Sequence, residues 1–247
     1  MERQRSPAKK RTMKRTTFLL SSSASLAAGA TAMGATTVPG GTDLVERRAS
    51  FDEAAFARLV GPPARIRQVV ESVAFNPTTL NNVKNALNGL EFGFGYPARD
   101  VAVVMANHGA ATAYGLSDPM WAKYRLGEFY KIADAGGAPL TANAYYPSKS
   151  AYDPHASPDD DHGMYQDTSI AMLQRRGVIV LACHTAIEEQ SRKLVAQHFA
   201  PAGATASEVA DDLLTHLVPG AFVVPSMVAT IAVLQAVYHY TYLTLTF

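Results

Sequence analysis

Two unbroken apolar runs place the strongest constraint on how this chain folds. They are VAVVMAN, at residues 101–107, and VIVLAC, at residues 178–183. Continuous apolar runs of this length are typical of strands that are covered on both faces, as in parallel sheets. Segments with helical periodicity precede each run. The alternation of strands and helices predicts a doubly wound α/β domain with a mainly parallel sheet and helices on both faces.

Local signals support the other elements of this domain. The Asn76-Pro77 pair is a helix start, because Asn caps the first turn and Pro supplies a preset φ. Thr205 and Glu208 have the spacing of a capping box, which favours a helix beginning there. The remaining predicted elements are strands at 64–75 and 220–225 and helices at 76–90, 186–199 and 205–217. We therefore expect a single α/β domain over residues 64–247.

The first 32 residues have the order of regions found in an export signal. A basic segment is followed by an apolar, small-residue run and then by the A-x-A-like sequence Ala30-Thr31-Ala32. Arg15 stands in the first position of a twin-arginine motif, but Thr16 replaces the second arginine, so the Sec and Tat routes both stay open. We expect residues 1–32 to direct export to the periplasm or the outside, with residues 33–63 as a linker.

The charge balance argues against a nucleic-acid partner. The whole chain has 22 basic and 21 acidic residues, and residues 1–32 hold 7 basic and 1 acidic residue. The remainder therefore has 15 basic and 20 acidic residues, a formal charge of −5. No basic stripe remains there that could neutralise phosphates.

Cys183 is the only cysteine of the chain and the main candidate for chemistry. In open parallel sheets, ligands bind beyond the carboxyl ends of the strands. If the two apolar strands are neighbours, one crevice receives Cys183 and five pocket candidates: Asn107, His108, Gly109, His184 and Thr185. The helix that follows Cys183 is expected to direct N–H groups at the sulfur, lower the thiol pKa and favour the nucleophilic thiolate.

Other interpretations of these residues stay open. Cysteine often packs as a small buried hydrophobe, and either histidine can simply bind a loop carbonyl. A metal site formed by Cys183, His108 and His184 lacks a fourth spaced ligand. The chain has no phosphate loop, dinucleotide fingerprint, G-x-S-x-G elbow or H-E-x-x-H motif, so no metal or cofactor is predicted.

Two segments depart from the alternation of strands and helices. Residues 117–163 exceed an ordinary βα connection and are expected to be an insertion over the site or a mobile flap. Within them, HASPDDDHG is a solvated acidic loop or a weak Ca²⁺ or Zn²⁺ site. Residues 227–247 carry no charge and are long enough to span a bilayer, but their Gln, His and Tyr residues favour a helix buried against the sheet or at a subunit interface.

Four sequence blocks together resemble the DsrE/DsrF-like family of sulfur-relay proteins. They are NPTTLNNVKNALNGL, VVMANHG, GVIVLACHTAIEE and LVPGAFVVPSMVATIAVLQAVYHYTYL, and the resemblance spans about residues 64–245. It implies a flavodoxin-like layered α/β fold, assembly into oligomers, and a cysteine at the position of Cys183 that carries sulfur as a persulfide. The long segment at 117–163 and the export signal depart from the family's compact cytoplasmic members.

From these residues we expect an exported sulfur carrier or sulfurtransferase-type protein that holds sulfane sulfur on Cys183. Its expected partners are further copies of itself and a sulfur donor or acceptor protein, with no stable membrane span. The alternative is a non-catalytic oligomeric module of the same fold that binds a small ligand or a metal.

Overall fold

The structure is a computed structural model that describes residues 44–244. The export signal expected at 1–32 and the first part of the linker lie outside the described residues. The described residues belong to one compact unit.

A five-stranded, all-parallel sheet forms the middle layer of the described domain, in the order β4-β3-β2-β1-β5. Its strands are β1 (Ile66–Ser72), β2 (Val101–Asn107), β3 (Val178–Cys183), β4 (Ala221–Val224) and β5 (Thr241–Thr244). The two apolar runs form β2 and β3 with the predicted bounds, and they are neighbours. The predicted fold class, a layered α/β domain consistent with a flavodoxin-like arrangement, is confirmed.

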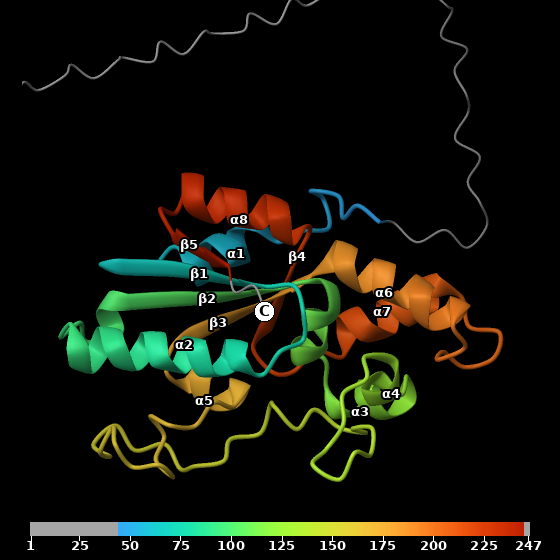
Figure 1. Cartoon of the computed structure of the whole chain (residues 1–247). Helices are drawn as coiled ribbons and strands as arrows, with labels where there is room; N and C mark the ends of the chain where they lie inside the picture. The colour runs from blue at the N-terminus through green and yellow to red at the C-terminus, as the bar shows by residue number, and fades with distance from the viewer. Residues whose placement is uncertain (1–43, 245–247) are drawn as a thin grey trace, which may run out of the picture. The chain divides into compact units, whose positions relative to one another are not determined.

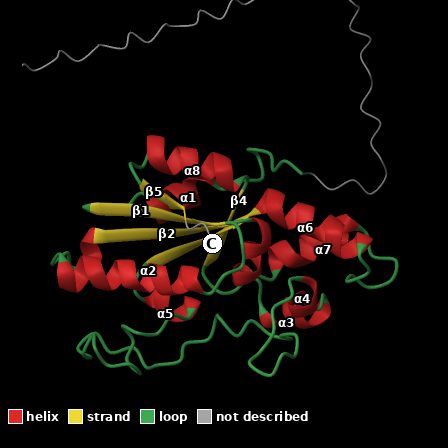
Figure 2. Cartoon of the chain, viewed as in Figure 1, coloured by secondary structure: helices red, strands yellow, loops and turns green. Residues whose placement is uncertain are grey.

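Helices cover both faces of the sheet and extend beyond its carboxyl end (Figure 1). They are α1 (Glu53–Val60), α2 (Thr78–Asn88), α3 (Asp118–Lys123), α4 (Leu126–Phe129), α5 (Ile170–Arg175), α6 (His184–Ala196), α7 (Ala206–Thr215) and α8 (Met227–Ala236), with the shorter turns η1 (Gly89–Gly93), η2 (Ala98–Asp100) and η3 (Gly109–Gly115). Helices α1 and α8 lie on one face, α2 and α5 lie on the other, and α6 and α7 lie past the strand ends (Figure 2).

Alternating side chains of the strands fill two separate cores. On the face covered by α1 and α8, Val69, Val104 and Leu181 pack in one buried cluster with Phe56 and Ile231. On the opposite face, the intervening strand residues pack against α2 and α5: Val70, Val103 and Val180, with Leu80 and Leu173. Because successive strand residues point to opposite faces, a strand buried on both sides is apolar at nearly every position.

The segment at 117–163 divides into two parts. Its first part is core, because α3 and α4 bury Trp121, Tyr124 and Leu126 beside α6 and α7. Between α4 and α5 the chain forms turns, bends and one isolated bridge, from Ala133 to Pro139. The expectation of an insertion therefore describes only this second part. The linker expected at 33–63 likewise contains α1, whose Phe56 and Val60 are buried.

The C-terminal segment corrects a prediction. Residues 227–236 form a helix on the sheet, as expected. The prediction that this helix continues past residue 236 is wrong. His239 has a φ of +58°, and Thr241–Thr244 then add a fifth strand beside β1. Pairing with β1 supplies partners for a segment rich in Thr, Tyr and Leu, which suits a strand. Within residues 44–244, no helix is long and apolar enough to cross a membrane.

Candidate functional site

Cys183 is the last residue of β3 and the N-cap of α6. Its side chain is buried, at 4% exposure. The sulfur accepts hydrogen bonds from two backbone N–H groups, that of Ala186 at 3.4 Å and that of Met227 at 3.2 Å. These donors belong to the first turns of α6 and α8. The expected geometry, in which helix N–H groups are directed at the sulfur, is present, and a second helix contributes to it.

The prediction that the pKa of this thiol is lowered is wrong. Burial raises the pKa of Cys183, and the N–H groups of Ala186, Met227 and Thr185 oppose this effect without cancelling it, while the charge of Glu189 adds to it. The sequence argument counted the helix N–H groups but not the removal of the sulfur from water, which disfavours the charged thiolate. The resting form at neutral pH is therefore the protonated thiol.

His108 is bound to a carboxylate that the sequence analysis did not identify. Its Nε2 atom lies 2.9 Å from Oε1 of Glu71 on β1, and the hydroxyl of Tyr242 on β5 donates to Oε2 of the same carboxylate. Both side chains of the His–Glu pair are mostly buried, with 18% and 14% exposure for His108 and Glu71. The three residues form one hydrogen-bonded cluster, which we call the Glu71 cluster.

The pKa of Glu71 is lowered. Burial acts in the opposite direction, but hydrogen bonds from Tyr242 and His108, the charge of His108 and a hydrogen bond from Thr244 outweigh it. An ionised Glu71 can orient the imidazole through this hydrogen bond. The cluster lies where β5 returns to the side of β1, the place where the strand order reverses and where open sheets often bind ligands.

The sheet register relates the Glu71 cluster to the cysteine. Asn107 pairs with Ala182, so the next residues along the two strands, His108 and Cys183, stand level with each other and on the same face. The imidazole of His108 is bonded toward β1, on the side away from β3. The arrangement therefore places a thiol and a carboxylate-bound histidine on adjacent strands, with the imidazole bonded toward β1.

His184 belongs to a second polar group near the start of α6. Its Nε2 atom lies 3.9 Å from Oε1 of Glu188, one turn later. Burial raises the pKa of Glu46, and the charge of His184 opposes that rise, so Glu46 is also a neighbour. One atom on each side chain is buried without a hydrogen-bond partner within residues 44–244: Nδ1 of His184, Oε2 of Glu188 and Oε2 of Glu46.

The other predicted site residues have separate roles. Asn107 is buried and, by strand alternation, faces away from Cys183. The hydroxyl of Thr185 donates to the carbonyls of Leu44 and Pro225. Gly109 has a φ of +56°, and an added Cβ would lie 2.8 Å from the carbonyl oxygen of Val73, so the turn after β2 requires glycine. The side chains of Asn107 and Thr185 are directed elsewhere, Gly109 shapes the turn, and of the three residues only Thr185 acts on the sulfur, through its backbone N–H.

Sequence reasoning missed Glu71, Glu188, Glu46 and Tyr242. Side chains alternate between the two faces of a strand, so the sequence places the charged Glu71 on the same face as the buried Val69. This alternation could have identified Glu71 as a site residue. Tyr242 was expected in a helix, and Glu46 was expected in the linker. Of the residues that the structure describes, no group of three or more His, Cys, Asp and Glu is placed to hold a metal ion.

Comparison of the chain with protein-family models, with curated protein sequences and with solved structures gave no match. The chemical interpretation of the site therefore depends on its own geometry.

Proposed function

We propose that this chain is a DsrE-like sulfur carrier that holds sulfane sulfur as a persulfide on Cys183. The observation that carries the proposal is the position of Sγ between the first turns of α6 and α8, with N–H donors from both. N–H groups at helix N-termini stabilise negative charge on sulfur. The same donors are suited to the thiolate that must form before sulfur is transferred.

The transfer itself is redox-neutral. The Cys183 thiolate attacks the outer sulfur of a donor persulfide, R–S–SH, and forms a new S–S bond. The S–S bond of the donor breaks, and its thiolate, R–S⁻, leaves with the electron pair. Because the resting thiol is protonated, a base must first remove its proton. We assign that role to His108, held by Glu71, or to His184, which follows Cys183 directly.

The test is intact-protein mass spectrometry of the reduced protein after incubation with a low-molecular-weight persulfide or thiosulfate. The expected result is a gain of one sulfur atom that reductant removes and that Cys183→Ser lacks. His108→Gln and His184→Gln should distinguish the two candidate bases, because only replacement of the histidine that acts as the base should slow adduct formation. A reduced, folded protein that gains no sulfur from either donor would overturn the carrier proposal.

The second candidate is a non-catalytic binding module, and the burial of Cys183 with its raised thiol pKa favours it. The effect of the two histidines on the alkylation of Cys183 by iodoacetamide near neutral pH separates the candidates. A rate that His108→Gln and His184→Gln leave unchanged, with a Cys183→Ser variant that keeps its ligand affinity, supports the module. A rate that His108→Gln or His184→Gln lowers supports the carrier.

Assembly and export complete the proposal. Helix α8 exposes Val228 and Val233, and the exposed Val237 follows it, so apolar side chains lie on the surface of this segment. Exposed apolar side chains of this kind support the proposed homo-oligomer, in addition to a sulfur donor or acceptor protein. Light scattering after size exclusion should show a multimer that Val228→Glu together with Val233→Glu dissociates. Export remains a prediction from residues 1–32, to be tested by fractionation of cells that express the full chain.

A further inference from the structure

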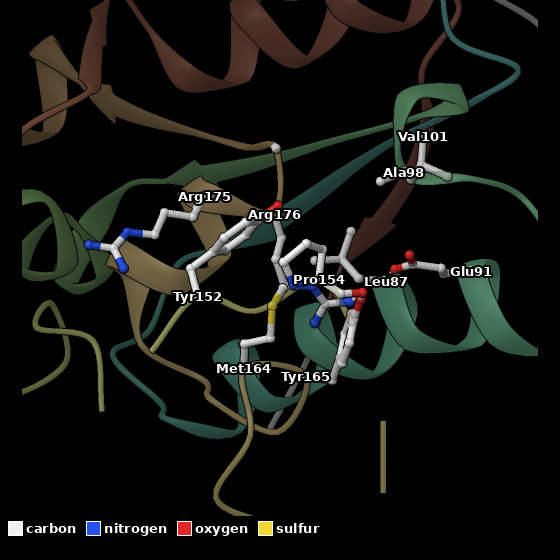
Figure 3. A pocket seen from close by; sticks show the side chains of 11 residues that line it. Leu87, Glu91, Ala98, Val101, Tyr152, Pro154, Met164, Tyr165, Arg175 and Arg176 are labelled. Carbon is white, nitrogen blue, oxygen red and sulfur yellow. Dashed lines mark hydrogen bonds and ion pairs between the residues drawn. The ribbon is translucent and has the colours of Figure 1, made fainter. Parts of the chain in front are cut away.

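A cavity of about 300 Å³ lies at the amino ends of β2 and β3, at the opposite end of the sheet from Cys183. Figure 3 shows its lining, which comes from three separate stretches of the chain. Its main lining residues are Leu87, Glu91, Tyr152, Met164, Tyr165 and Arg176. The size is at the lower end of the range for small-molecule sites.

Arg176 is the unusual member of this lining. Its side chain is only 4% exposed, so the guanidinium has lost its water. Nη2 donates to Oδ1 of Asn88 at 2.7 Å and lies 3.6 Å from Oε2 of Glu91. Nη1 is buried and has no hydrogen-bond partner in the part of the chain that the structure describes.

A buried guanidinium with an unused nitrogen needs an explanation. Leaving a buried donor without an acceptor is unfavourable, and more so when the group is charged. Burial lowers the pKa of Arg176, and the charge of Glu91 opposes that change. Glu91 is engaged on the Nη2 side. Nη1 therefore has no acceptor among the described residues and is available to a molecule bound in the cavity.

The rest of the lining indicates what kind of molecule supplies that acceptor. The ring of Tyr165 lies over the guanidinium, 4.9 Å from Cζ, and Leu87 and Met164 add apolar surface. Arg175 also lines the cavity, but Figure 3 shows its guanidinium pointing away from the group around Arg176. One free guanidinium nitrogen beside one carboxylate suits a monoanion better than a polyanion.

We propose that this cavity binds a small monocarboxylate with an apolar or aromatic body, whose carboxylate accepts a hydrogen bond from Nη1 of Arg176. The proposal does not depend on sulfur chemistry at Cys183.

The proposal also gives a role to the loop before α5, at residues 152–165. The hydroxyl of Tyr165 donates to the carbonyl of Pro154 at 3.0 Å, and the side-chain amide of Asn88 donates to the carbonyl of Tyr165 at 2.8 Å. These bonds hold the loop against α2 as one wall of the cavity. The half-exposed Tyr152 lies on the same wall.

The test is isothermal titration calorimetry of the full chain with 3-phenylpropionate, with hexanoate, and with the uncharged analogue 3-phenylpropionamide. At least one acid is expected to bind, and 3-phenylpropionate is expected to bind roughly ten- to a hundredfold more tightly than its amide, as expected for a hydrogen bond to a charged group. Arg176→Gln should remove that preference. Arg58→Gln, which makes the same charge change on the exposed face of α1, should keep it.

Because Arg176 also bonds Asn88, its replacement can unfold the protein, so a second variant is needed. Ala98 is an exposed residue that lines the cavity, and Ala98→Phe should fill the cavity while leaving Arg176 in place. The proposal predicts that this variant folds, by circular dichroism, and loses binding of the acid. Cys183→Ser should bind the acid as the wild type does, so the outcome is independent of the sulfur-carrier test.

Three results would overturn the proposal. They are equal affinity for 3-phenylpropionate and its amide, no binding of either acid by the folded wild type, and wild-type affinity in Ala98→Phe.

Discussion

The backbone N–H of Met227 donates to Sγ of Cys183 at 3.2 Å, although 44 positions separate the two residues. The contact follows from the sheet, in which Cys183 pairs with Val224 on the neighbouring parallel strand. The helices that follow β3 and β4 therefore begin side by side, and both offer N–H groups to one sulfur. A cysteine at the end of an edge strand has a neighbouring strand on one side only, so at most one neighbouring helix could begin beside it.

The raised pKa of Cys183 predicts slow, strongly pH-dependent alkylation. At pH 7 the reaction with iodoacetamide should be slower than in the urea-unfolded chain, and its rate should still be rising above pH 9, where a thiol with an ordinary pKa near 8.5 is already mostly ionised. A rate that levels off below pH 8 would contradict the raised pKa.

The same shift predicts a loss of stability at high pH. The folded state holds the thiol proton more tightly than the unfolded state, so the free energy of unfolding should fall as the pH rises above about 8.5. Urea titrations of the wild type and Cys183→Ser at pH 7 and pH 10 measure this effect. The free energy of unfolding of the wild type, taken relative to that of Cys183→Ser, should be smaller at pH 10 than at pH 7.

Glu71 should stabilise the fold above acidic pH. Its pKa is lowered in the folded state, so its contribution should be present above an unfolded pKa of about 4.3 and lost as the pH falls through the folded pKa. Urea unfolding of Glu71→Gln against the wild type at pH 7 and at pH 3 should show a cost at pH 7 that shrinks at pH 3. Glu128→Gln, at an exposed ion pair, is the control and should change stability little.

Gly109 should tolerate alanine less well than another glycine with a positive φ. Gly95 has a φ of +73° and open space where an added Cβ would lie, whereas an added Cβ at Gly109 meets the Val73 carbonyl oxygen at 2.8 Å. Gly95→Ala should cost about 1–2 kcal/mol through its backbone conformation alone. Gly109→Ala should cost more, and thermal unfolding of the two variants compares them. Equal losses would show that the turn adjusts to the methyl group.

The capping box at the start of α7 should contribute measurably to stability. The hydroxyl of Thr205 accepts from the N–H of Glu208 at 3.2 Å, and the Glu208 carboxylate accepts from the Thr205 N–H at 2.8 Å. Thr205→Ala should lower the free energy of unfolding by about 1 kcal/mol. Ser207→Ala, inside the first turn, should leave it nearly unchanged in the same urea titration.

Much of the fold could be predicted because local sequence dictates it. The bounds of β2 and β3 follow from apolar runs, since a strand buried on both faces is almost entirely apolar. The start of α7 follows from Thr205 and Glu208, since capping bonds join residues three apart. The position of Cys183 at the end of β3, before a helix, was predicted in the same way.

The candidate site was predicted only in part, because its environment is not local. Asn107, His108 and Gly109 were expected in one crevice with Cys183, yet Asn107 faces the other side of the sheet and His108 is bonded to Glu71. Arg176 stands beside an exposed arginine in the sequence, and nothing in that pair distinguishes the buried one.

The alternation of strands and helices, the capping box of α7 and the place of the cysteine at a strand end can all be deduced from the amino-acid order. Each of these depends on side-chain periodicity or on contacts within one turn of the chain. Long-range packing is needed to return β5 to the side of β1, which brings Tyr242 to Glu71, and to start α8 beside α6, which brings Met227 to Cys183. The order of strands depends on how the complete apolar faces pack, and that order decides whether the sulfur is exposed or desolvated.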